Sequence, residues 1–125
     1  MRLDELIQTI ELDTHIDPDY LFEMANIREK DSGLPMTMFV SSKQYVSGRH
    51  GPRLKVSNLR HKFSADDNFV VILSKEPILG KNAKYKESEL NNLVDWIKLN
   101  LDVLLKYWND EYESDADFLL ALKKI

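Results

Sequence analysis

Residues Glu87–Asn109, which read ESELNNLVDWIKLNLDVLLKYWN, are the stretch that decides the fold. Their apolar side chains recur at steps of three and four, which is the period of an α-helix. A helix that is apolar over so wide an arc needs more than one neighbour to cover it. We therefore expect one long helix over residues 87–109. One stripe holds Leu90, Leu93, Val94, Ile97, Leu101, Leu104, Leu105 and Trp108, with the core centred on Leu93, Ile97, Leu101 and Leu104, and a flanking stripe holds Trp96, Leu99, Val103 and Tyr107.

A further short helix is expected after this segment. Ser114–Asp117 has the pattern of a helix start, because the serine hydroxyl can cap free amides of the first turn. The helix that follows would carry Phe118, Leu119 and Leu122.

The amino-terminal third is also predicted to be helical. Apolar residues at helical spacing predict a short helix near residues 3–11. Asp17-Pro18 is typical of the start of a second helix, since proline at the first helical position sacrifices no hydrogen bond. We expect this second helix to include Ala25–Arg28 and to end at Asp31–Gly33.

The middle of the chain is predicted to form strands. Met36–Val40 is β-prone, and Lys43–Val46 extends it after a bend. Ser47–Pro52 holds two glycines and a proline in six residues, which is typical of a turn. Arg53–Val56 alternates cationic and apolar side chains, as a half-exposed strand does. Phe69–Leu73 is a continuous apolar run, which suits a strand covered on both faces.

These elements predict an α+β fold class. We expect a small antiparallel sheet of three to four strands packed against one long C-terminal helix, with N-terminal helices beside it. No Pro-, Gly- or Ser-rich linker interrupts the 125 residues, so a single domain over residues 1–125 is expected.

Composition excludes several classes of protein. With 43% hydrophobic and 30% charged residues, the chain belongs with globular rather than disordered sequences. It has no cysteine, which excludes disulfides, a thiolate nucleophile and a zinc site built on Cys. The longest apolar run is too short to span a bilayer, and the N-terminus lacks the pattern of a signal peptide. We therefore expect a soluble cytoplasmic protein with no membrane contact.

Charge is segregated along the chain. Residues 1–31 hold 3 basic and 9 acidic side chains, residues 32–86 hold 10 and 3, and residues 87–125 hold 4 and 9. The 34 residues between Asp31 and Asp66 contain no acid. Such a segment predicts a surface that attracts phosphate groups or an acidic partner. The alternative is that the basic strands pair with acidic helices of the same chain, and the sequence leaves both interpretations open.

The candidate site lies within this basic segment. On an alternating strand Arg53 and Lys55 project from the same face, and the preceding turn places Arg49 and His50 at its edge. The predicted residues for nucleic-acid or anion binding are Arg49, His50, Arg53, Lys55, Arg60 and Lys62. If there is any catalysis, His50 is the candidate general acid or base of a metal-independent ribonuclease, with His61 as the other choice. The three histidines are too scattered to predict a metal site, and no cofactor motif is present.

From Gly51 onward the order of elements resembles a family of small uncharacterised bacterial proteins. The likeness lies in the Pro-containing turn and strand Gly51–Val56, the helix end Leu104–Asn109 and the terminal Leu122–Ile125, and it covers roughly the last 75 residues. Members of that family are often encoded in toxin–antitoxin-like pairs or on mobile elements. They carry Pro-His-x-His at the turn, where this chain has Arg53 and Lys55 at the two His positions. The resemblance implies a genetic context, and the departure argues against His-based chemistry.

These observations predict a non-enzymatic binding module of a bacterial or phage accessory system, toxin–antitoxin-like or defence-related. Its basic strand region would bind nucleic acid or an acidic protein partner. One alternative is a small metal-independent ribonuclease toxin, and another is an acidic protein inhibitor whose helices mimic nucleic acid. The wide apolar arc also predicts a homodimer with Tyr107 and Trp108 at a two-fold interface.

Overall fold

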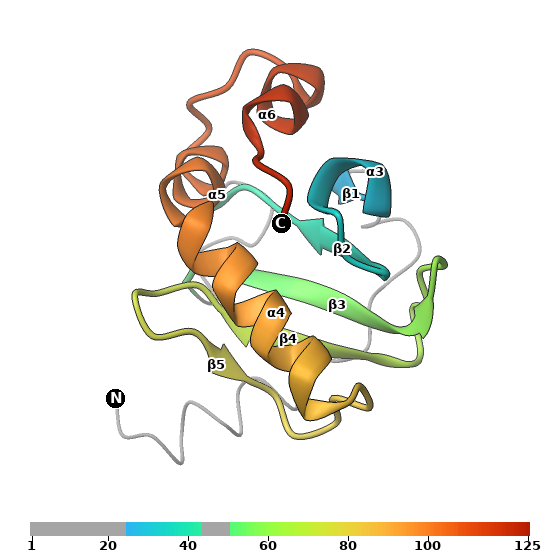
Figure 1. Cartoon of the computed structure of the whole chain (residues 1–125). Helices are drawn as coiled ribbons and strands as arrows, with labels where there is room; N and C mark the ends of the chain where they lie inside the picture. The colour runs from blue at the N-terminus through green and yellow to red at the C-terminus, as the bar shows by residue number, and fades with distance from the viewer. Residues whose placement is uncertain (1–24, 44–50) are drawn as a thin grey trace.

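The fold is α+β, with one sheet and helices packed against it (Figure 1). The computed structural model describes residues 25–43 and 51–125. Within these ranges five strands form one antiparallel sheet in the order β1-β2-β3-β4-β5, so each strand pairs with its neighbour in sequence. The elements are β1 (Ala25–Ile27), α3 (Glu29–Ser32), β2 (Met36–Val40), β3 (Arg53–Arg60), β4 (Asn68–Ile72), β5 (Ile78–Leu79), α4 (Glu87–Leu99), α5 (Leu101–Trp108) and α6 (Asp115–Ala121).

The three central strands confirm the predicted ones. β2 has the predicted bounds, β3 continues four residues beyond Val56, and β4 begins one residue before Phe69. The expected burial of the β4 run is confirmed, because Phe69, Val70 and Val71 are fully buried although they alternate between the two faces.

Two short edge strands were not predicted, and one of them replaces part of an expected helix. Ala25 pairs with Val40 and Ile27 with Met38, so these apolar residues form β1 and bury in the core. Strand pairing with β2 therefore overrides their helical spacing. Only the four-residue α3 follows, and it ends as expected at Gly33, which has a left-handed φ of 80°. The expected helix at 3–11 and the start of the second lie outside the described residues.

The single long helix expected over residues 87–109 is not confirmed, because it is interrupted at Asn100. This residue has φ −111° and ψ 14°, and it separates α4 from α5. Its side chain is fully buried and donates from Nδ2 to the carbonyl oxygens of Trp96 and Lys123, both at 3.0 Å. Its Oδ1 accepts from Lys123 N at 2.8 Å. The amide thus holds the C-terminal tail at the point where the helix bends.

The apolar arc is covered by two neighbours, as its width requires. Leu93, Ile97 and Leu104 are fully buried in the same core as the sheet, while Leu101, expected at the centre, is only half-buried. α6 covers the flank of α5, where the rings of Tyr107 and Phe118 lie 4.4 Å apart.

The predicted cap of α6 is confirmed, since Ser114 Oγ accepts from Asp117 N at 3.2 Å. Tyr107 and Trp108, expected at a two-fold interface, are both buried within the chain. Self-association therefore stays a prediction, but the position of Tyr107 and Trp108 no longer supports it.

Candidate binding surface

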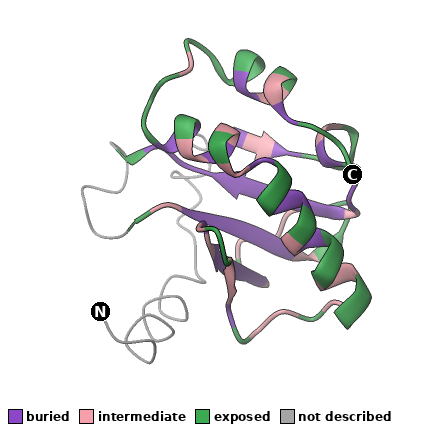
Figure 2. Cartoon of the chain, turned by 60° about the vertical axis from the view of Figure 1, so that its left-hand side comes forward, coloured by how far each residue is buried: buried purple, intermediate pink, exposed green. Residues whose placement is uncertain are grey.

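The two faces of the sheet differ in chemistry. Leu54 and Val56 of β3 point into the core beneath α4 and α5, and we call this side the helix face. The opposite side carries the alternate residues of the same strands, which the register places in cross-strand rows. We call it the basic face; its residues are Asn26, Phe39, Arg53, Lys55, Val70 and Ile72. Figure 2 shows that the central strands are buried, whereas α4 has an exposed outer side.

Arg53 and Lys55 are buried on the basic face, although their alternating strand predicted half exposure. They are 5% and 7% exposed. Lys55 lies between its cross-strand partners Phe39 and Val70, and Arg53 lies opposite Ile72. Both basic residues have interacting neighbours. Because a buried cation loses its hydration, this face strongly favours negatively charged groups close to these two side chains.

The basic face also offers buried hydrogen-bond acceptors. Asn26 lies in the same row as Lys55, on the far side of Phe39, and its Oδ1 is buried without a hydrogen bond. Asn68, next to Val70 at the edge of this face, donates to the carbonyl oxygens of Ser64 and Ala65 while its buried Oδ1 accepts none. A ligand that meets both requirements carries anionic groups together with N–H donors.

The turn after β3 carries the exposed basic residues. The side chains of Arg60 and His61 are 52% and 59% exposed, and Lys62 is also exposed. Arg60 forms an ion pair with Glu89 at 2.5 Å and lies over the Tyr85 ring at 5.7 Å. His61 has a left-handed φ of 58°, and its Nδ1 lies 3.7 Å from Glu29. Arg60 and His61 thus each lie beside an acidic side chain.

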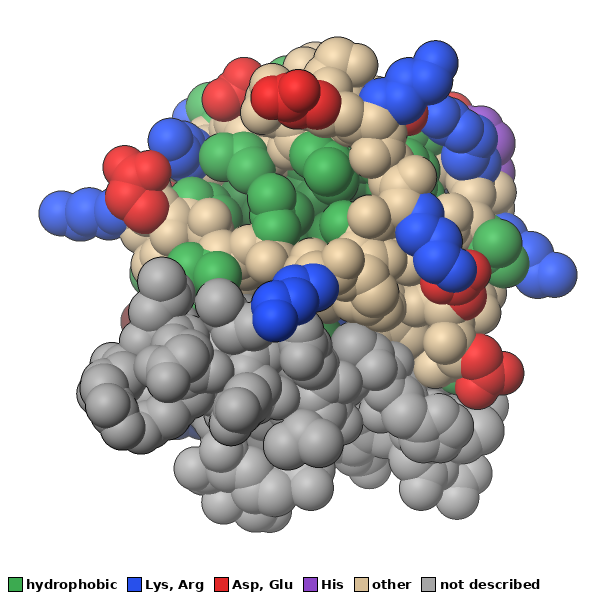
Figure 3. Space-filling model, turned by 90° about the horizontal axis from the view of Figure 1, so that it is seen from below, with side chains coloured by type: hydrophobic (Ala, Val, Ile, Leu, Met, Phe, Trp, Pro, Cys, Tyr) green, Lys and Arg blue, Asp and Glu red, His purple; other side chains and the backbone are tan. Residues whose placement is uncertain are grey.

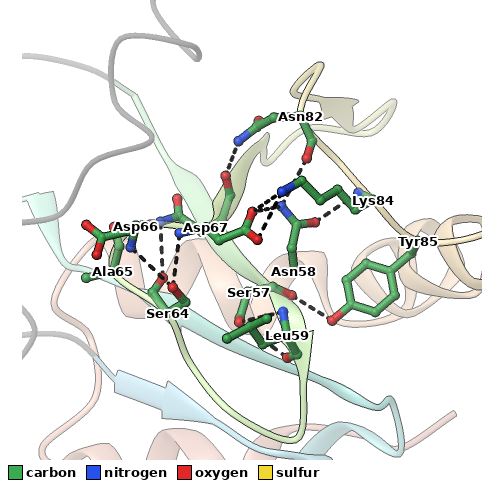
Figure 4. Close-up of polar contacts among 11 residues, drawn as sticks. Ser57, Asn58, Leu59, Ser64, Ala65, Asp66, Asp67, Asn82, Lys84 and Tyr85 are labelled. Carbon is green, nitrogen blue, oxygen red and sulfur yellow. Dashed lines mark hydrogen bonds and ion pairs between the residues drawn. The ribbon is translucent and has the colours of Figure 1, made fainter.

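A polar network near this same end of β3 was not predicted (Figure 4). Asn58 donates from Nδ2 to Asp67 Oδ1 and to the carbonyl oxygen of Asn82, both at 3.0 Å, and its Oδ1 accepts from Lys84 N at 2.9 Å. Lys84 Nζ lies 2.9 Å from Asp67 Oδ1, and Tyr85 Oη donates to the Ser57 carbonyl at 2.7 Å. These bonds fasten the segment between β5 and α4 to the end of the β3–β4 hairpin, so the network is structural.

The pKa values of two groups in this network are shifted. Hydrogen bonds from Lys84 and Asn58 hold the pKa of Asp67 below its usual value. Burial raises the pKa of the Tyr85 hydroxyl. Both shifts favour the protonation states that make the observed bonds near neutral pH.

Exposed charge elsewhere is mixed in sign. On the face seen from below, hydrophobic side chains gather in the middle of the described surface, and Lys, Arg, Asp and Glu side chains are scattered around them (Figure 3).

No group of three or more His, Asp and Glu side chains that could hold a metal ion occurs in residues 25–43 and 51–125. In the same ranges, no helix is long and apolar enough to cross a bilayer.

The structure brings together only part of the predicted site. Arg53 and Lys55 share the basic face, as expected, whereas Arg60 and Lys62 lie at the turn that ends the strand. Arg49 and His50 lie outside the described residues. The contribution of Asn26 was missed because nothing in the sequence marks a strand asparagine as a buried acceptor. Comparisons with protein-family models, with curated proteins and with solved structures give no match.

Proposed function

We propose that the protein is a non-enzymatic binding module whose basic face engages an acidic polypeptide. The observation that carries this proposal is the pair of buried cations, Arg53 and Lys55, on one face of the central strand β3. Carboxylates that reach this face gain strong, weakly screened attraction, because the surroundings exclude water.

The chemistry of the basic face suits a polypeptide better than a nucleic-acid backbone. Phosphate binding along a strand requires several exposed cations, since each neutralised phosphate must reach one. Here the two cations are flanked by Phe39, Val70 and Ile72, and a buried Asn26 Oδ1 lies in the same row as Lys55. An acidic peptide supplies both a carboxylate for the cations and main-chain N–H groups for the amide oxygen.

Nucleic-acid binding is the second candidate, and the exposed turn residues Arg60 and Lys62 favour it. They lie two residues apart at the end of β3, and both are exposed, although Arg60 also pairs with Glu89. The ribonuclease toxin is a weaker alternative. It is supported by the exposed His61, which lies beside the Glu29 carboxylate. His50→Ala would test the other candidate histidine. The acidic-inhibitor alternative would instead depend on Asp102, Asp110 and Glu113.

The resemblance of roughly the last 75 residues to a family of small bacterial proteins supports the proposal that the binding module belongs to a bacterial or phage accessory system. An acidic polypeptide partner is consistent with that context.

The proposal is tested by fluorescence titration of the full chain with a labelled oligo-glutamate peptide and with labelled single- and double-stranded RNA, each at two salt concentrations. Arg53→Gln with Lys55→Gln should weaken oligo-glutamate binding at least about tenfold, because removing charges from a desolvated site costs about 2–5 kcal/mol. Arg60→Gln with Lys62→Gln should weaken RNA binding only.

The matched control is Lys75→Gln with Lys86→Gln, which removes two exposed cations elsewhere and should leave both affinities unchanged. The thermal midpoint of each variant shows whether it is folded. If a folded Arg53/Lys55 variant binds oligo-glutamate as tightly as wild type, the basic face is not the site. Binding of RNA alone, lost with Arg60 and Lys62, would establish the second candidate instead.

A further inference from the structure

We propose that two copies of this chain associate through the edge strand β5, with Leu79 of one copy paired antiparallel with Leu79 of the partner subunit across a two-fold axis. This inference goes beyond the proposed function and does not depend on it. The occupant of the edge is a second copy of the chain.

An apolar surface lies at β5. Among the described strands β5 is the last in the sheet order, so its far side is not paired with another of them. β5 is also the lowest strand in Figure 1, and the view from below shows hydrophobic side chains gathered in the middle of the described surface (Figure 3). Both residues of β5, Ile78 and Leu79, are only half-buried. The edge therefore combines strand geometry with accessible apolar side chains, a combination that favours pairing with a further strand.

The main-chain groups of Leu79 are directed away from β4. Gly80 N donates to Val70 O at 2.8 Å, and Leu79 is the register partner of Val71. In an antiparallel pair, hydrogen-bonded and non-hydrogen-bonded residue pairs alternate along the strand. Because Gly80 and Val70 form a hydrogen-bonded pair, the N–H and C=O of Leu79 face the far side of β5. One donor and one acceptor are what the same residue of an antiparallel second copy satisfies.

The sequence around β5 favours this register over its neighbour. With Leu79 opposite itself, Lys75 lies opposite an alanine and Lys81 lies opposite Pro77 of the partner subunit, so no like charges face each other. The neighbouring register, with Ile78 opposite itself, would set Lys75 opposite Lys81. It would also set Pro77, which has no N–H, opposite Leu79. Like charges directly opposite each other destabilise a strand pair, and a proline removes a ladder hydrogen bond.

The helix beside this edge supplies an apolar stripe that can meet its own copy. Leu90 and Val94 are half-buried and lie one turn apart on α4. Lys98, one turn further along, pairs with Glu76 just before β5 at 3.6 Å, so this side of α4 faces the edge. A two-fold axis perpendicular to the sheet keeps both α4 helices on one side of the joined sheets, where the two stripes come together.

The direct test is disulfide capture, which is specific because the chain has no cysteine. Leu79→Cys places the only thiol of each copy at the axis, where paired Cα atoms lie about 5.5 Å apart, a distance that a disulfide spans. Leu120→Cys is the matched control, since Leu120 is 85% exposed on α6. Under mild oxidation at micromolar concentration, Leu79→Cys should form a covalent dimer at least about tenfold faster than the control, because pairing raises the effective concentration of the second thiol.

Sedimentation equilibrium measures association without an added thiol. Wild type and Leu120→Lys should approach the mass of two chains as the concentration rises from low to high micromolar. Leu79→Lys with Leu90→Lys should raise the Kd of the dimer at least about tenfold, because it brings like charges together at the axis. The circular dichroism spectrum and thermal midpoint show whether this variant is folded.

Three results would overturn the inference. The first is a wild-type protein that keeps the mass of one chain at high micromolar concentration. The second is Leu79→Cys that oxidises to a dimer no faster than Leu120→Cys. The third is a dimer that Leu120→Cys captures faster than Leu79→Cys, which would place the interface on α6 instead of β5.

Discussion

Lys55 is the residue on which the proposed function depends most. Its ammonium group belongs to a side chain that is 7% exposed between a phenylalanine and a valine. Lysine is rarely buried to this degree without a compensating group, because dehydration of the charge is costly. The burial of Lys55, together with that of Arg53, is therefore the observation on which the proposed function rests.

Gly33 is a second residue with a defined role, and it yields a stability prediction. It has φ +80°, and a Cβ atom there would lie 2.7 Å from the carbonyl oxygen of Ile125. Ile125 N also donates to Ser32 O at 3.0 Å, so the tail is close to this turn. Gly33→Ala should lower the free energy of unfolding by about 1–3 kcal/mol through strain and displacement of the tail. Denaturant unfolding of the variant and of wild type measures this difference in free energy.

Gly51→Ala is the matched control, because a Cβ at Gly51 meets nothing within 4 Å. This variant should be neutral or slightly stabilising, since alanine restricts the unfolded chain. Equal effects of the two substitutions would contradict the role assigned to Gly33.

Asp67 gives a prediction for pH dependence. Its pKa is lowered in the folded protein by Lys84 and Asn58, so the folded state binds a proton less readily than the unfolded state. The stabilisation is therefore present above the usual carboxyl pKa and is lost as the pH falls through the lowered folded value. Asp67→Asn should be less stable than wild type at pH 7, and the two thermal midpoints should converge toward pH 2.

The thermal midpoint of Lys84→Gln should converge with that of wild type in the same way. The double variant Asp67→Asn with Lys84→Gln should be no less stable than either single variant. The effect is modest because both side chains are partly exposed. A difference between wild type and Asp67→Asn that stays constant from pH 7 to pH 2 would show that the ion pair is not its cause.

Among the elements, those with a strong local signal could be predicted from sequence. The period of residues 87–109, the Ser114 cap and the β-prone runs each required only neighbouring residues. β1 and β5 could not be predicted, since strands of three and two residues have no measurable period and exist through pairing. The break at Asn100 could not be predicted either, because the apolar spacing continues across it.

The break is the feature of the helical layer that is easiest to test. Asn100→Leu removes three hydrogen bonds and leaves the Lys123 amide without its acceptor. We expect a loss of about 2–3 kcal/mol in unfolding free energy and faster hydrogen exchange at Lys123. Asn109→Leu is the control: its exposed amide makes bonds to Leu105 O and Lys43 Nζ, and its loss should cost much less.

The candidate site was only partly predictable, for a physical reason. Alternation in Arg53–Val56 establishes which side chains share a face, and that part is confirmed. Whether the cationic face is exposed depends on what packs over it, which strand periodicity does not encode. The expected continuous set therefore divides into buried cations on the sheet and exposed cations at the turn.

In the whole molecule, charge segregation and topology act together. The basic segment forms the centre of the sheet, while acidic residues are concentrated before β1 and in the helices after β5. This arrangement places a cationic layer on the side of the sheet opposite α4 and α5. Under the proposed function, an acidic polypeptide partner would complement that layer.

The most direct measurement is a nuclear magnetic resonance titration of the isotopically labelled full chain with oligo-glutamate, in which the backbone amides report where the peptide binds. We predict the largest shift changes at Arg53–Val56 and at the paired Met38–Val40 and Val70–Ile72, with little change in α6. Changes confined to Arg60–Lys62, or an absence of changes at saturating peptide in low salt, would contradict binding on the basic face.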